Sequence, residues 1–124
     1  MVKRVYERIQ IVVKANQRTS VQHRLRSDYG NAVGVFFYIP AQSYGDSTNN
    51  IYCNLRIASQ EVIADGAALD LFRWQPGISR SEAMWEFRDA NVPAATNLLE
   101  CEIDNQTQRE YTINLYVLLE NREA

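Results

Sequence analysis

The chain has 124 residues, of which 46% are hydrophobic and 23% charged, and its formal net charge is −2 at pH 7. This composition is that of a globular domain and excludes a disordered chain or one built of membrane spans. The negative charge argues against a general nucleic-acid binder, because such a protein needs a cationic surface to replace the counterions of phosphates. We expect a single domain over residues 1–124, without a membrane role and without nucleic acid as its main partner.

The N-terminal part of the chain predicts three strands. Residues 8–15 alternate apolar and polar side chains, as a strand with one buried face does. Residues 21–26 alternate again after the turn residues 16–20, and the run at 33–39 is apolar on both faces. A strand that is apolar on both faces is covered on both, either by the chain itself or by another subunit.

The first ten residues and the cysteines indicate whether the chain is secreted into an oxidising compartment. MVKRVYERIQ carries charge where a secretory signal peptide needs an apolar core, so the mature chain is expected to begin at or near Met1. Cys53 and Cys101 alternate in step with apolar neighbours, which predicts two buried free thiols. Two cysteines and a single histidine make no convincing zinc site, and no metal or cofactor is expected.

The middle of the chain predicts a polar loop followed by short strands. Residues 41–50, AQSYGDSTNN, form the loop, and strand alternation resumes at 51–57. The segment 61–74 is predicted as two short strands around Asp65-Gly66, because this dipeptide is typical of hairpin turns. A helix over the same segment is the alternative.

Residues 80–89 are the least regular part of the sequence. Ser79 and Glu82 have the spacing of a capping box, which predicts one short helix. The competing interpretation is a strand that contains both Trp85 and Phe87. In either case the segment leads through residues 91–97 to the last part of the chain.

Residues 98–121 are predicted as an amphipathic β-hairpin. Two alternating runs, 98–104 and 109–121, are joined by the polar stretch 105–108. The chain then has about seven or eight short strands and too few helical segments to connect parallel strands. The predicted fold is therefore all-β, an antiparallel β-sandwich or jelly roll with at most one short helix.

Groups that carry catalysis are scarce. The single histidine, His23, alternates in step with Val21 and Leu25, as a structural histidine does. There is no nucleophile motif, no phosphate-binding glycine loop, and no diagnostic spacing among the carboxylates. We expect no enzyme and no cofactor.

The strand-rich chain, with EVIADGAALDLF at its centre and the long strand REYTINLYVLL near its end, resembles small virion proteins of bacteriophages. These proteins decorate a capsid, occupy its vertices or serve as tail accessories. The resemblance implies a sandwich or jelly roll that acts as a symmetric oligomer, with copies of itself and other structural proteins as partners. It also implies a place in the virion, after assembly in the host cytoplasm.

Four residues are predicted to make the contacts of such an assembly. Phe36, Tyr38, Tyr116 and Leu118 lie on the second faces of strands whose first faces already supply a core. Apolar side chains on a second face mark an interface when they are exposed.

The alternative function is that of a carbohydrate-binding or lectin-like module. In this interpretation Tyr44, Trp74 and Trp85 stack on sugar rings, while Asn49, Asn50 or Asp46 bond sugar hydroxyls. Exposed aromatic rings beside amides and carboxylates are the groups that such sites use.

Overall fold

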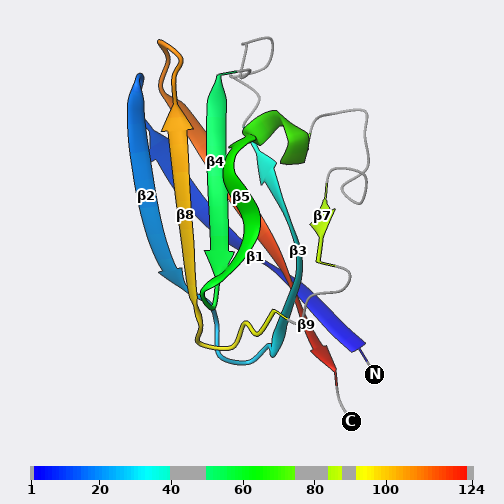
Figure 1. The fold of residues 1–124 in the computed structure, drawn as a ribbon. Coiled ribbons are helices and arrows are strands. Elements are labelled where there is room, and N and C mark those ends of the chain that lie inside the picture. Colours follow the sequence, from blue (N-terminus) through cyan, green and yellow to red (C-terminus); the bar gives the residue numbers. More distant parts are fainter. Residues whose placement is uncertain (1, 40–49, 75–83, 88–91, 123–124) are drawn as a thin grey trace.

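The computed structural model describes residues 2–39, 50–74, 84–87 and 92–122, which form a sandwich of two β-sheets (Figure 1). The strands are β1 (Val2–Val13), β2 (Gln17–Arg24), β3 (Asn31–Tyr38), β4 (Ile51–Ile57), β5 (Gln60–Ala68), β6 (Arg73–Trp74), β7 (Trp85–Glu86), β8 (Leu98–Asn105) and β9 (Tyr111–Arg122). A short 3-10 helix, η2 (Leu69–Phe72), joins β5 to β6. Within the described residues, no helix is long and apolar enough to cross a bilayer.

The two sheets are mainly antiparallel. The five-stranded sheet has the order β1-β9-β3-β6, with β7 also paired to β3, and the four-stranded sheet has the order β2-β8-β4-β5. The pair β3 and β6 is parallel, and the other strand pairs are antiparallel. The predicted all-β sandwich is confirmed, although the described part contains nine strands because β6 and β7 are two-residue pieces.

The core lies between the sheets and is built by the alternating positions of the long strands. Ile113, Leu115 and Val117 on β9 face Leu99, Cys101 and Ile103 on β8 across the sandwich, and all six are buried. Phe37 on β3 and Leu55 on β4 are fully buried in the same layer. This inner surface accounts for the alternation in the sequence.

The hairpin predicted over residues 98–121 is wrong, although both of its strands are present. β8 belongs to the four-stranded sheet and β9 to the five-stranded sheet, so the chain crosses from one sheet to the other between them. β1 and β2 are related in the same way. Alternation shows only that a strand has one buried face. The next strand can bury its own apolar face either beside the first strand in the same sheet or opposite it in the other sheet.

The two crossings lie side by side and are joined through one buried amide. The backbone N–H of Asn16 donates to the carbonyl of Thr107 at 3.0 Å. The fully buried Asn105 Nδ2 donates to the carbonyls of Lys14 at 3.2 Å and Arg109 at 2.7 Å. Its Oδ1 accepts from the backbone N–H of Thr107 at 3.0 Å and from the Thr107 hydroxyl at 2.6 Å. Asn105 therefore ties together both places where the chain changes sheets.

The segment 61–74 also differs from its prediction. Asp65 and Gly66 form no hairpin turn; they lie in an irregular stretch inside the single strand β5, where Gly66 has a φ of +85°. The hairpin turn falls earlier, between β4 and β5, where Ala58 and Ser59 have φ values of 53° and 65°. Two consecutive left-handed residues form the type of turn that suits a two-residue hairpin, but alanine and serine do not signal it in sequence.

The helix predicted over residues 80–89 is wrong where the structure describes it. Trp85–Glu86 forms β7, which pairs with β3, and Met84 and Phe87 flank it without regular secondary structure. The strand alternative is therefore correct for Trp85, whereas Phe87 lies just beyond the strand. Residues 80–83 and 88–89 lie outside the described residues, as does the predicted loop except for Asn50.

Cys53 and Cys101 are free and buried on the inner faces of β4 and β8, as predicted. Removal from water disfavours the thiolate, which raises the pKa of Cys53 to about 12 and raises that of Cys101 as well. We therefore expect both thiols to react with Ellman's reagent at pH 8 at least about 100-fold more slowly in the folded protein than in guanidinium chloride. Rapid reaction of either thiol in the folded state would contradict their placement in the core.

Candidate functional site

The candidate site is an aromatic groove on the outer face of the five-stranded sheet. It has a volume of about 280 Å³ and is lined by Tyr6, Phe36, Tyr38, Trp74 and Tyr116. Strand pairing brings these residues together: Phe36 on β3 lies opposite Tyr116 on β9, and Tyr38 lies opposite Trp74 on β6. Four strands from distant parts of the sequence thus contribute to one surface.

The rings of the aromatic groove support one another in two groups. Phe36 and Tyr116 stack with their centroids 5.1 Å apart, and Tyr6 contacts both edge-on at 5.8 Å and 6.3 Å. Tyr38 and Trp74 form a tilted pair at 5.1 Å. Such contacts hold aromatic side chains in place before a ligand arrives, which reduces the entropy cost of binding.

The four residues predicted as contacts fall into two classes. Tyr38 and Tyr116 are partly exposed in the groove. Phe36 lines the groove but is buried, and Leu118 is buried and is not part of the groove lining, so neither has the exposure that marks an interface residue. Sequence reasoning missed Tyr6, which is 38% exposed. The signal was available, because Tyr6 is two residues before Arg8 and shares its outward face; the first strand was predicted to begin only at residue 8.

The residues predicted to stack on sugars do not form one row. Trp74 lies in the aromatic groove with Tyr38. Trp85, 47% exposed, instead donates its indole N–H to the carbonyl of Val62 on β5 at 2.8 Å and contacts Phe72 edge-on at 5.6 Å. It therefore joins the edges of the two sheets. Tyr44, Asp46 and Asn49 lie outside the described residues, and Asn50 is an exposed turn residue.

Polar groups stand beside the groove. Arg8 lies opposite Tyr116 in the register, is exposed, and forms no ion pair within the described part of the chain. Asn114, on the same face of β9, lies between Gln10 and Tyr38 and is only 7% exposed. Its Oδ1 has no hydrogen-bond partner among the described residues. The groove thus combines aromatic walls with one cation and one amide nearby.

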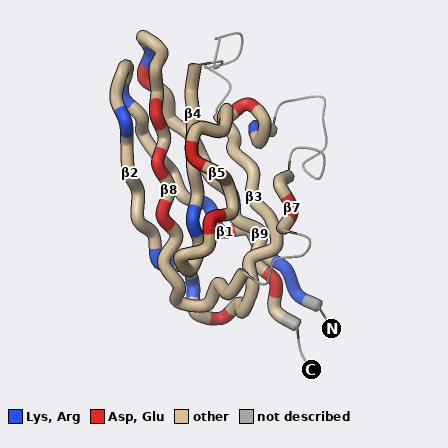
Figure 2. The backbone as a smooth tube through the Cα atoms, in the orientation of Figure 1, with Lys and Arg blue, Asp and Glu red and all other residues tan. Residues whose placement is uncertain are grey.

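The outer face of the four-stranded sheet is different in character. Acidic residues recur along β8, as the red segments of the tube in Figure 2 show, and Arg18 on β2 pairs with Glu102 at 2.6 Å and with Asp65 at 3.5 Å. Hydrogen bonding to Glu102 raises the pKa of Arg18. Within the described ranges no three metal-ligating side chains are grouped closely enough to hold an ion. This face has the solvated ion pairs of an ordinary protein surface.

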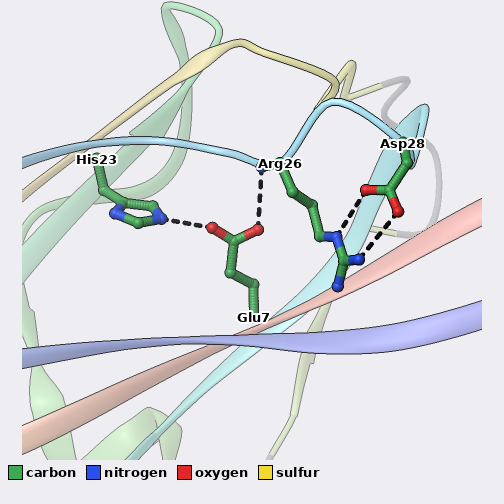
Figure 3. A network of polar contacts seen from close by, with 4 residues as sticks. All are labelled: Glu7, His23, Arg26 and Asp28. Atoms are coloured by element: carbon green, nitrogen blue, oxygen red, sulfur yellow. Dashed lines mark hydrogen bonds and ion pairs between the residues drawn. The ribbon is translucent and has the colours of Figure 1, made fainter.

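His23 lies in a polar network that closes the side of the sandwich between β1 and β2 (Figure 3). Its Nε2 contacts the carboxylate of Glu7, which points inward from β1 and also accepts the backbone N–H of Arg26 at 3.1 Å. Arg26 in turn binds Asp28 through two hydrogen bonds of 2.6 Å and 2.9 Å, which lowers the pKa of Asp28. Because His23 lies on β2 and Glu7 on β1, their contact joins the two sheets.

Comparison of the chain with models of known protein families and with curated protein sequences finds no match. The candidate site therefore rests on its geometry alone.

Proposed function

We propose that this protein is a non-enzymatic structural component of a larger assembly and that it docks through the aromatic groove. One observation carries the proposal: the outer faces of the two sheets differ. The four-stranded sheet presents charged side chains to solvent, whereas the five-stranded sheet presents the clustered rings of Tyr6, Tyr38 and Tyr116. Clustered aromatic residues on the outer face of a sheet are typical of a protein interface.

The groove has the properties of an interface anchor. Its rings offer large apolar area with few rotatable bonds, and they are already packed against one another. Arg8 and Gln10 on β1 supply polar neighbours at its edge. Buried aromatic anchors within a polar rim carry most of the binding free energy in protein interfaces.

The resemblance to small virion proteins of bacteriophages indicates the kind of assembly to which we propose that the protein belongs. We propose a capsid or tail accessory, located in the virion and assembled in the host cytoplasm, with copies of itself and other structural proteins as partners. A β-sandwich with one charged and one aromatic outer face suits this role, since it docks on one side and remains solvated on the other.

Removing one ring of the groove is expected to weaken association. Tyr116→Ser should raise the dissociation constant of the oligomer at least about 10-fold, because the stacked partner of Phe36 and a large part of the groove wall are lost. Light scattering after size exclusion, over a range of protein concentrations, measures the change. The matched control is Tyr52→Ser, the same substitution on the outer face of the four-stranded sheet. Equal effects of the two substitutions would contradict the proposal.

A carbohydrate-binding function is the second candidate. Trp74 and Tyr38 form an aromatic pair, and Asn114, whose Oδ1 has no hydrogen-bond partner among the described residues, lies on the neighbouring strand at the level of Tyr38. Sugar sites combine such rings with buried amides. Calorimetric titration with a panel of glycans tests it: heat that Trp74→Ala abolishes would favour this function, and a panel without heat would remove it.

A further inference from the structure

The described surface carries an apolar side chain that the aromatic groove can receive. Leu71 in η2 is 71% exposed, more than the other large exposed hydrophobic residues, Tyr6, Val12 and Trp85. A single exposed leucine is ordinary on a protein surface. Leu71 differs because the same surface also has an unfilled apolar groove of about 280 Å³.

η2 holds Leu71 on a firm base. Its neighbours Leu69 and Phe72 are buried in the core on either side, so the turn between them is fixed. The carboxylate of Asp70 lies 3.8 Å from the guanidinium of the buried Arg73, which ties the same turn to β6. Leu71 is therefore presented to solvent by a rigid element, which lowers the entropy cost of inserting it into a partner.

We propose that Leu71 of one copy inserts into the aromatic groove of a second copy. The inference rests on the proposed function and deepens it by naming the occupant of the groove. Charge supports the pairing: the carboxylate of Asp70 beside Leu71 stays partly exposed although it pairs with Arg73, and the groove edge carries Arg8, which has no ion pair within the described residues. A contact between two different surfaces of the same chain repeats from copy to copy, and it gives a reciprocal dimer or a ring where the rotation closes and an open filament where it does not.

The test uses two variants that each remove one surface. Leu71→Ser removes the inserted side chain, and Tyr116→Ser opens the groove. At a concentration where the wild-type chain is associated, each variant alone is expected to be monomeric, with a dissociation constant raised at least about 10-fold. A 1:1 mixture of the two is expected to form a mixed dimer, because the groove of the first variant receives Leu71 of the second. Light scattering gives the mass, and circular dichroism confirms that each variant is folded.

The outcomes separate this inference from the proposed function. If Tyr116→Ser is monomeric while Leu71→Ser keeps the wild-type mass, Leu71 is not the occupant, but docking through the groove stands. If both variants keep the wild-type mass, the copies do not associate through the groove, and Leu71 is not its occupant. A wild-type chain that stays monomeric at all concentrations overturns the inference and leaves only docking on another protein. Should Tyr116→Ser fail to fold, Tyr6→Ser, at a more exposed position of the groove, takes its place.

Discussion

Replacing Asn105 by alanine is expected to lower the free energy of unfolding by about 3 kcal/mol. The side chain is fully buried and makes four hydrogen bonds, which reach both crossings between the sheets. Alanine removes these bonds and leaves the carbonyls of Lys14 and Arg109 without this donor. Each lost bond costs about 1 kcal/mol, less where water can reach the abandoned group. Chemical denaturation followed by fluorescence measures the loss.

The neighbouring residue provides the control. Gln106 is exposed, and its amide donates to the carboxylate of Asp104 at 2.9 Å on the surface. Gln106→Ala should change stability by less than about 0.5 kcal/mol. If Asn105→Ala costs less than about 1 kcal/mol, the two crossings are held by packing and backbone bonds, and the amide has no special role.

Alternation in the sequence predicted the strands well because burial of one face acts directly on residue choice. The runs at β8 and β9 place Leu99, Ile103 and Leu115 in the core as expected. The connections were harder to predict because the partner of a strand depends on the whole sandwich. Asn105-Gln106-Thr107-Gln108 has the composition of a hairpin turn, yet Asn105 is buried and holds a crossing between sheets.

The groove was predictable only in part for the same reason. Phe36, Tyr38 and Tyr116 were placed on second faces by parity, which is a local property. Their meeting with Trp74 depends on the parallel pairing of β3 with the two-residue strand β6, for which the sequence has no local signal. Trp85 is a residue type that often stacks on ligands, but here its indole bonds to Val62 at the edge of the sandwich. This contact joins segments far apart in the sequence, so no local pattern predicts it.

Gly34→Val is expected to lower the free energy of unfolding by about 2 kcal/mol, because it forces β7 away from β3. A Cβ at position 34 would lie 2.7 Å from Sδ of Met84, 2.8 Å from its Cγ and 3.1 Å from the carbonyl oxygen of Trp85. The methionine side chain can move, but the carbonyl is backbone of β7 and is held beside β3 by the bond from the Phe87 N–H to the Val33 carbonyl at 3.0 Å. The strand must therefore shift.

Displacement of β7 should have its own signature. The indole of Trp85 would lose its bond to the Val62 carbonyl, so its fluorescence should move to longer wavelength and the Phe87 amide should exchange faster with deuterium. Gly30→Ala is the matched control, since a Cβ there meets nothing within 4 Å, and its effect should stay within about 0.5 kcal/mol. A Gly34→Val protein with wild-type stability and an unchanged spectrum would mean that Met84 alone absorbs the new side chain. The contact between His23 and Glu7 joins the two sheets at one side of the sandwich, and the bond from Trp85 to Val62 joins them at the other. Displacement of β7 would therefore remove the indole bond that links the sheets at this second side.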